Sequence, residues 1–515
     1  AYGQGEVTHR PVEPGWRAGL QALRQDLTGR IMAGLPGETG TIAAALMTGE
    51  RRAIPGETLD AIRDSGLAHL LAISGLHIGL VTALLFGGLR LLFCLSPGLA
   101  ERWPAKKLAA ALALPGALAY ALIAGATVPS LRAFLMVAVV LTAVLLDRRG
   151  ISMRNVAIAA FLLLLAMPES LLGPSFQMSF AAVTALVAAY EVLQAKGWWP
   201  TGQRVQQRGQ GGWLRRAGTY LAGVAISTLI AGLATAPFAA FHFNRVADFS
   251  LLANLAAVPV TALWTMPSAL AAFILMPLGW EGPALAVMGA GIEVMTAIAR
   301  WVADLPGAVT LVPAMPGWSL VLLTAGSFWL LAARGVARSL GPVTIAASLA
   351  LALATPKPDL LIDAKGRLIG LNDGLGFQVS SLSTARFERD VWLGRLATAE
   401  AGKFPRDGAN GGLRCDIAAC RWVTPYGTSV ALIRHPAALA EDCRSARLVI
   451  SLERVPTDCR RLTRVIDKGD IRAKGATAVY LRWDGSIRIE TDRERRGDRP
   501  WVALPAPHQP RSTAW

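Results

Sequence analysis

Three side chains that could do chemistry interrupt an apolar stretch, HLLAISGLHIGL, at residues 69–80. Ser74 and His77 are three residues apart, so on a helix they share one face and could act as nucleophile and base. His69 lies eight residues before His77, roughly 80° away around a helix. The stretch contains no Asp or Glu that could orient the histidine. The hypothesis of a hydrolase that uses Ser74 and His77 therefore lacks the acidic residue that would orient the base.

The glycines of the same stretch favour a different role. Gly75 and Gly79 are four residues apart, and small residues at this spacing let another helix approach closely or let the helix break. A break inside a membrane is tolerated where protein rather than lipid surrounds it. We therefore expect His69, Ser74, Gly75 and His77 to line a polar path or to pack against another helix.

Other polar residues interrupt apolar runs further along the chain. Each is a candidate functional residue because a polar side chain is costly inside a bilayer, although a hydrogen bond between two helices explains many single cases. Several such residues together favour a polar cavity. They are Arg132 in VPSLRAF, Gln177 and Ser179 in PSFQMSF, Asn254, and also Glu191 and Glu293.

The apolar residues are concentrated between residues 67 and 354. Of the 515 residues, 53% are hydrophobic and only 17% are charged, whereas about a quarter are charged in soluble proteins. After residue 354 no apolar run reaches the roughly 20 residues that cross a bilayer. We predict a polytopic α-helical membrane protein with about ten transmembrane segments, followed by a soluble α/β or mainly β domain. The expected segments are 67–95, 107–126, 131–146, 155–167, 175–195, 217–241, 249–279, 283–302, 317–333 and 341–354.

Two of these expectations concern the shape of individual segments. The segment at 249–279 is interrupted by Pro259 and Pro267, so it is either one broken helix or two helices. The segments at 155–167 and 341–354 are short for a full crossing.

The basic residues predict an orientation. Lys and Arg collect at 102–107, 148–154 and 196–216 and at Arg334 and Arg338, whereas the loops at 127–130, 168–174 and 303–316 have none. Basic loops stay in the cytoplasm. If 249–279 is one crossing, both chain ends lie outside the cytoplasm, and the tail is periplasmic. The basic loops that fix the orientation also account for the positive charge of the membrane part within the net charge of +16. They explain less in the tail, which is also rich in arginine.

The N-terminal part is more polar than the membrane segments. Residues 17–66 predict helices, the first amphipathic, which lies in the membrane interface or packs on its own domain. The chain begins Ala-Tyr without a visible signal peptide, so we expect a processed product or a piece of a longer chain.

The tail, residues 355–515, has short apolar runs separated by AKG, NDG and DG turns, which predict β-hairpins. Four of the five cysteines lie there: Cys415, Cys420, Cys443 and Cys459. Their spacing is not typical of a zinc site, and an even number favours disulfides in an oxidising compartment. Reduced, buried cysteines are the alternative.

Motifs for metals and nucleotides are absent from the sequence. It contains no P-loop, so no ATPase is expected in this chain. The tail has only His435 and His508, far apart in sequence, so a zinc-hydrolase cluster cannot be assembled from it. We therefore predict no metal site and no cofactor.

Four sequence blocks together resemble one family. AALMTGERRAIP, GLAHLLAISGLHIGLV, ATVPSLRAFLM and GPSFQMSFAAV occur in the order and spacing of the competence domain of ComEC-type DNA-uptake proteins, and the resemblance covers roughly residues 17–350. It implies a channel that carries single-stranded DNA across the bacterial inner membrane during natural transformation. The matching positions are His69, Leu70, Ser74, Gly75, Leu76, His77, Arg132, Ala133, Phe176, Gln177 and Ser179.

The resemblance also sets expectations for both ends and for partners. Residues 1–16 would be the end of an upstream, OB-fold-like domain. The tail occupies the place of a metallo-β-lactamase-like domain, but the metal-binding motif is missing, which implies a degenerate, non-catalytic version. The expected partners are single-stranded DNA, the lipid bilayer, a periplasmic DNA-binding receptor and a cytoplasmic helicase-like ATPase. A small-molecule permease is a rival function, which predicts paired inverted repeats with broken helices.

Overall fold

The computed structural model describes residues 15–95, 104–196, 213–497 and 499. The chain divides into two compact units. The first comprises the residues up to 242 and residues 246–310, and the second comprises 243–245 and the residues from 311 onward. The division falls within two short strands, β1 (Arg245–Ala247) and β2 (Val309–Leu311), which pair as a two-stranded sheet. Each unit has a hydrophobic core of its own.

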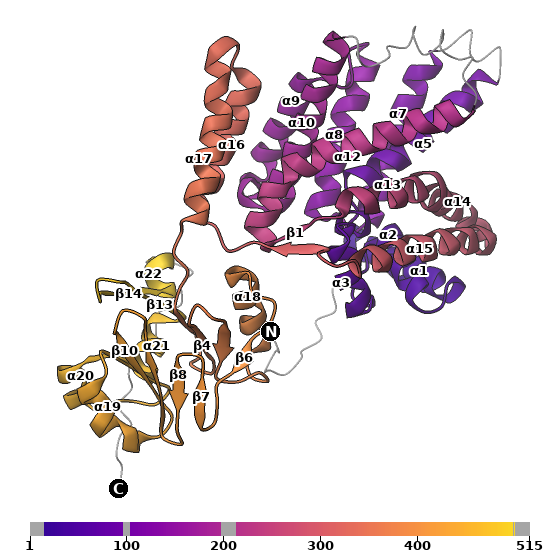
Figure 1. The fold of residues 1–515 in the computed structure, drawn as a ribbon. Coiled ribbons are helices and arrows are strands. Elements are labelled where there is room, and N and C mark those ends of the chain that lie inside the picture. Colours follow the sequence, from indigo (N-terminus) through magenta and orange to yellow (C-terminus); the bar gives the residue numbers. More distant parts are fainter. Residues whose placement is uncertain (1–14, 96–103, 197–212, 498, 500–515) are drawn as a thin grey trace. The chain divides into compact units, whose positions relative to one another are not determined.

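Helices make up almost all of the first unit (Figure 1). Consecutive helices with short connections pack side by side, as α7, α8 and α9 do. The helices are α1 (Trp16–Gly34), α2 (Glu38–Thr48), α3 (Gly56–Asp64), α4 (Ala68–Leu71), α5 (Gly75–Cys94), α7 (Ala105–Ile123), α8 (Val128–Leu145), α9 (Met153–Ala166), η1 (Pro168–Leu172), α10 (Pro174–Ala195), α12 (Trp213–Phe243), α13 (Ser250–Val260), η2 (Thr261–Thr265), α14 (Met266–Leu275), η3 (Met276–Leu278) and α15 (Glu281–Ala303).

The prediction of a polytopic helical membrane protein with a β-rich tail is confirmed. Among the described residues, eight helices are long and apolar enough to cross a membrane, and Met153–Ala166 and Gly317–Ala332 are shorter apolar helices. These helices correspond to the ten expected segments, and two of them, Met153–Ala166 and Gly317–Ala332, are short for a full crossing. The last segment was wrongly expected to be short, because a preceding 3₁₀ turn extends it to Gly335–Leu353.

The expected start of the first segment, residue 67, is also wrong. The spanning helix α5 begins at Gly75, and His69 lies in the separate four-residue helix α4. Apolar composition continues across both helices, so the sequence pattern alone does not reveal the break. The extended backbone of Ser74 separates them.

The long segment is a single interrupted helix. Pro259 lies inside α13, the five residues Thr261–Thr265 form a π-helical turn, and Pro267 opens α14. Proline has no backbone N–H and disturbs the preceding turn, which accounts for the local irregularity. Residues Ser250–Leu278 together are long enough to span a membrane.

The N-terminal helices belong to the core of the first unit. Every residue of α2 from Gly40 to Thr48 is buried, and α1 buries Leu27 and Ile31. The Arg24 guanidinium donates to the carbonyls of Thr48 and Ile123, both at 2.9 Å, at the C-terminal ends of α2 and α7. Such carbonyls have no partner within their own helix. Arg24 therefore joins the N-terminal helices to the apolar bundle.

The second unit contains α16 (Gly317–Ala332), η4 (Gly335–Ser339), α17 (Leu340–Leu353) and the tail domain. The tail has two six-stranded sheets, whose strand orders are β14-β13-β3-β4-β5-β6 and β12-β11-β10-β9-β8-β7. Their strands are β3 (Leu360–Ile362), β4 (Ile369–Asn372), β5 (Phe377–Val379), β6 (Gly402–Lys403), β7 (Gly408–Asn410), β8 (Leu413–Cys415), β9 (Ala419–Val423), β10 (Ser429–Ile433), β11 (Leu448–Ser451), β12 (Arg464–Ile466), β13 (Thr477–Leu481) and β14 (Ile487–Thr491).

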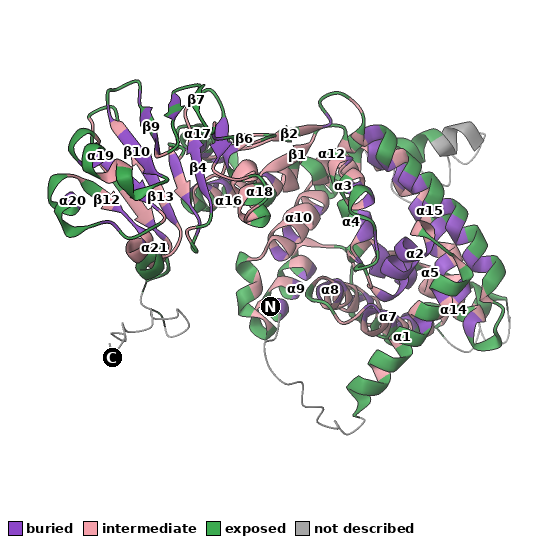
Figure 2. Ribbon diagram, turned by 90° about the horizontal axis from the view of Figure 1, so that it is seen from below, coloured by how far each residue is buried: buried purple, intermediate pink, exposed green. Residues whose placement is uncertain are grey.

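The two sheets bury one core between them, and helices cover their outer faces. Figure 2 shows that the buried residues of the tail lie mainly on its strands. One disulfide joins Cys415 to Cys420 across the β8–β9 hairpin, and the other joins Cys443 to Cys459. The helices are α18 (Arg386–Leu396), η5 (Pro436–Ala438), α19 (Leu439–Ser445), α20 (Thr457–Leu462), α21 (Lys468–Lys474) and α22 (Asp492–Arg496).

Candidate functional site

Ser74 and His77 together begin the membrane-spanning helix α5. Ser74 is the N-cap residue, and its hydroxyl accepts a hydrogen bond from the Leu76 N–H at 3.3 Å. The ring Nδ1 of His77 accepts from the Ser74 backbone N–H at 3.5 Å. This reciprocal arrangement is a capping box, in which histidine takes the place usually held by Glu or Gln. A polar pair is therefore required at this point to start the helix.

The His77 side chain is fully buried. Because Nδ1 accepts a hydrogen bond, the ring proton belongs on Nε2, and Nε2 has no hydrogen-bond partner in the part of the chain that is described. The Ser74 hydroxyl lies 3.4 Å from Nδ1, at the upper limit of a hydrogen bond. No acidic side chain among the described residues bonds to the ring, so the geometry fits a helix cap with a free donor better than a catalytic base.

His69 lies in the segment before α5, and Asn254 lies near the start of another membrane helix, α13. His69 is exposed, and its Nδ1 is 3.1 Å from the carbonyl of Gly66. A Cβ on Gly66 would lie 2.6 Å from the Cβ of Ser250, the first residue of α13. Asn254 is buried, donates to the Ser250 carbonyl at 2.7 Å and leaves its own oxygen without a partner in the described structure. The segment before α5 is thus held against the start of α13.

A second polar group joins three helices. The buried Arg132 of α8 donates to the hydroxyl of Ser175 at the start of α10, at 2.6 Å. Gln177, one turn along α10, lies 2.8 Å from the Nε2 atom of His242 near the end of α12. The pair of Arg132 and Ser175 thus links α10 to α8, and the pair of Gln177 and His242 links α10 to α12. The two polar pairs together are called the polar cluster below.

Sequence reasoning found only part of this cluster. It selected Arg132, Gln177 and Ser179, of which Ser179 is half-buried on α10. It missed Ser175 and His242, although His242 ends an apolar run and meets the same criterion as the residues selected. Glu191 and Glu293 are exposed on their helices, so the structure does not bring them into either polar group.

The candidate residues gather at one end of the helical bundle. Consecutive helices with short connections alternate in direction, so α5, α8 and α10 begin at one end and α12 ends there (Figure 1). The basic residues at 106–107 and 148–154 lie at the opposite end. The N-termini of α5, α8 and α10 lie there beside the C-termini of α7, α9 and α12, so the helix dipoles largely offset one another, and the Arg132 guanidinium is the positive charge of the polar cluster.

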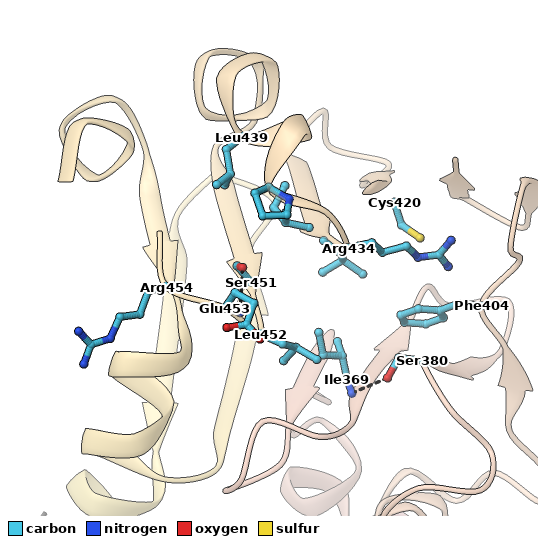
Figure 3. Close-up of a pocket in the computed structure, with 13 residues that line it drawn as sticks. Ile369, Ser380, Phe404, Cys420, Arg434, Leu439, Ser451, Leu452, Glu453 and Arg454 are labelled. Atoms are coloured by element: carbon cyan, nitrogen blue, oxygen red, sulfur yellow. Dashed lines mark hydrogen bonds between the residues drawn. The ribbon is translucent and has the colours of Figure 1, made fainter. Parts of the chain in front are cut away.

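The tail domain has a separate pocket between its two sheets. Figure 3 shows this cavity of about 290 Å³, where Ile369 and Ser380 come from one sheet and Cys420 and Ser451 from the other. The guanidinium of Arg434 is occupied by the carbonyls of Pro405, Arg406 and Asp416. Among the described residues, no group of three His, Cys, Asp or Glu side chains could hold a metal ion.

Comparison with known proteins gives one family and several relatives. The family model described as Competence protein matches residues 46–336. ComE operon protein 3 of Bacillus subtilis is 29% identical over 50% of this chain and 29% of its own length. Competence protein ComA of Neisseria gonorrhoeae is 43% identical over 28% of this chain and 20% of its own. An uncharacterized protein, YcaI, of Escherichia coli is 31% identical over 45% of this chain and 29% of its own.

The chain thus aligns with less than a third of the length of each of these relatives. No solved structure matches it.

Proposed function

The chain belongs to the competence protein family, whose model matches more than half of its residues, and from this we propose that it carries single-stranded DNA across the bacterial inner membrane. Membership in this family supports a role in DNA uptake for transformation, and the apolar helices make the chain a multi-pass membrane protein. The specific activity, a channel for one DNA strand, is the proposal.

The observation that supports a channel is the polar cluster at one end of the bundle. A DNA strand carries one negative charge per nucleotide and needs a positive, hydrated path through the bilayer. Arg132 is buried in the membrane part and bonded to Ser175, with its Nε atom unpartnered among the described residues. The guanidinium carries five N–H donors, and the contact with Ser175 uses one of them.

The remaining proposals follow from this role. The end that carries the polar cluster is periplasmic, since the basic loops lie at the other end, and the tail domain is periplasmic as well. A periplasmic DNA-binding receptor delivers the strand, and a cytoplasmic helicase-like ATPase pulls it. We infer that the tail is a degenerate metallo-β-lactamase-like domain and that the chain is not an enzyme.

Two rival functions remain testable. The interrupted helix at Ser250–Leu278 favours a small-molecule permease, because such transporters place broken helices at their binding sites. A hydrolase using Ser74 and His77 is weakened by the capping box, which accounts for the contact between the two side chains.

Transformation frequency with an Arg132→Met variant tests the channel. Methionine keeps a long, unbranched side chain and removes the charge, and immunoblotting checks that the membrane level is unchanged. We expect DNA uptake to fall by a factor of roughly 100 or more, because the strand loses a desolvated cationic contact of about 3 kcal/mol.

The matched control is Arg63→Met, which removes the same charge from an exposed side chain of α3. Its transformation frequency should equal that of the unmodified protein at equal membrane level. If Arg132→Met also transforms normally, the cluster is structural and the DNA path lies elsewhere.

A further inference from the structure

A short linker connects the membrane helix α17 to one end of the tail domain. This helix ends at Leu353 and β3 begins at Leu360, so only residues 354–359 connect them. Six fully extended residues span at most roughly 20 Å. The end of the domain where β3 begins, called the linker end below, therefore lies close to the bilayer surface.

Two hairpin turns of the first sheet lie at the linker end. Strands β13 and β4 are the antiparallel neighbours of β3, so the turns that follow them flank its first residue. Asp359 confirms this register. Its side chain accepts from the Leu481 N–H at 2.6 Å, and its carbonyl accepts from the Asn372 N–H at 2.8 Å. The turns at 373–376 and 482–486 thus stand on either side of the linker.

The second sheet presents its corresponding edge at the same end. Arg464, which opens β12, donates to the carbonyl of Ile487 at the start of β14, at 2.9 Å. Arg447 precedes β11, and a Cβ on Gly485 would lie 2.8 Å from its guanidinium. The Arg447 N–H also bonds to the carbonyl of Ser429, where β10 begins. The β9–β10 turn at 424–428 therefore belongs to the linker end too.

Each of these three turns exposes a large apolar or aromatic side chain. Leu375 is 85% exposed, Trp483 is 78% exposed and Tyr426 is 62% exposed. Arg447 and Arg482 are exposed beside them. Two turns also carry an acidic residue each, whose carboxylate is bonded within its own turn: Asp373 accepts from the N–H groups of Leu375 and Gly376, and the exposed Asp484 accepts from that of Ser486. The linker end therefore exposes apolar side chains and two arginines, beside two carboxylates that are bonded to their own turns.

We propose that the linker end of the tail domain docks on the lipid headgroup layer of the membrane that holds α17. Trp and Tyr favour the boundary between headgroups and hydrocarbon, and Leu gains by leaving water. Arg447 and Arg482 pair with lipid phosphates. The pocket of Figure 3, lined by residues at the opposite ends of these strands, then faces away from the bilayer.

Single-stranded nucleic acid is the other partner that arginines and aromatic rings could bind. The position of Leu375 argues against it, because an aliphatic side chain offers bases no ring to stack on. The short linker also places this surface at the membrane. Lipid is therefore the occupant that the structure favours.

The test uses the full chain, with Cys94→Ser, in nanodiscs of phosphatidylethanolamine and phosphatidylglycerol. An environment-sensitive fluorophore is attached to a cysteine introduced as Leu375→Cys or Trp483→Cys. The control is Phe387→Cys. Phe387 is also exposed but lies at the opposite end of the domain, because the neighbouring Glu388 contacts Arg367 of the β3–β4 turn. Brominated lipids then serve as quenchers.

We expect several-fold stronger quenching at positions 375 and 483 than at position 387. Equal quenching at all three positions would overturn the proposal. The proposal would also be overturned if brominated lipids did not quench the labels at 375 and 483 but an added oligothymidine changed their fluorescence, because this surface would then bind single-stranded nucleic acid. All three substitutions replace exposed side chains, so loss of folding is not expected.

Discussion

Ser74 and His77 contact each other as the two partners of a helix cap. The backbone N–H of Ser74 donates to the ring Nδ1 of His77, and the Ser74 hydroxyl accepts from the N–H of Leu76. A nucleophile needs its hydroxyl proton removed by the base, but here the same ring nitrogen faces a backbone donor. The Nε2 donor of His77 is the atom left to act on something else.

A Ser74→Asn variant separates these roles. Asparagine caps helices about as well as serine but cannot act as a nucleophile. We expect DNA uptake and membrane level close to those of the unmodified protein. Ser74→Ala, which removes the cap, should cost about 1 kcal/mol and lower the membrane level. Transformation assays with immunoblotting measure both, and loss of uptake in Ser74→Asn at normal level would restore the hydrolase hypothesis.

The cost of polar groups in a bilayer identifies single candidate residues but not their partners. It selected Arg132 and Gln177 from the sequence, and the structure places each of them in a contact between helices. Their partners Ser175 and His242 lie 43 and 65 residues further along the chain. Only helix packing brings such distant positions together, so one sequence cannot show which polar residues meet.

Gly66 ends α3 and turns the chain toward α4. Its φ of +79° is in the left-handed region, and a Cβ there would meet Ser250 of α13 at 2.6 Å. Gly66→Ala should therefore destabilise the first unit by more than the roughly 1–2 kcal/mol of backbone strain alone. The measurement is the temperature at which half of the detergent-solubilised protein is lost from its size-exclusion peak.

Gly279→Ala supplies the control for Gly66→Ala. Gly279 has a similar φ, +70°, but nothing lies within 4 Å of its added Cβ. The control measures strain without the clash, so it should lower the midpoint less. Equal midpoints for the two variants would show that the contact with α13 is not tight.

Asp467 links the start of α21 to Arg460 in the tail domain. The buried carboxylate accepts from the N–H groups of Gly469 and Val455 and pairs with Arg460 at 2.7 Å. Burial alone would raise the pKa of Asp467, but the Arg460 pair and the backbone donors outweigh it and lower the pKa. A lowered folded-state pKa stabilises the fold above the unfolded value of about 3.9 and loses that effect as pH falls.

Asp467→Asn should therefore reduce resistance to proteolysis of the tail at pH 7. The difference from the unmodified protein should begin to shrink as the pH falls below about 4, where the carboxylate of the unfolded chain is protonated, and should vanish below the lowered pKa of the native carboxylate. Asp458→Asn is the control, because Asp458 is exposed and 3.9 Å from Arg461. A deficit of Asp467→Asn that persisted unchanged at low pH would assign the role of Asp467 to packing instead of charge.

Helices were easier to predict than their interruptions. Each of the ten apolar segments contains a helix because apolar composition over such lengths has few other solutions. The break at Ser74 and the π turn at Thr261–Thr265 depend on local hydrogen bonds and on prolines. The strand pairings of the tail, such as β13 beside β3, join residues more than a hundred positions apart, which turn signals cannot reveal.

The distribution of cysteines in the whole molecule tests the proposed orientation. Cys94 ends α5 at the same end of the bundle as the basic residues, and it is the free cysteine among the described residues. The other four form the two disulfides of the tail. With basic loops in the cytoplasm, Cys94 lies on the cytoplasmic side and the tail cysteines lie outside.

Intact spheroplasts treated with a membrane-impermeable maleimide should therefore show no labelling, because the outer cysteines are paired and the free one is inside. An impermeable phosphine reductant should then expose the tail thiols to the reagent, whereas Cys94 should react only after the membrane is permeabilised. Cys94→Ser removes that last signal and identifies it. Labelling of Cys94 in intact spheroplasts would invert the orientation, place the polar cluster at the cytoplasmic end and require DNA to meet the basic loops first.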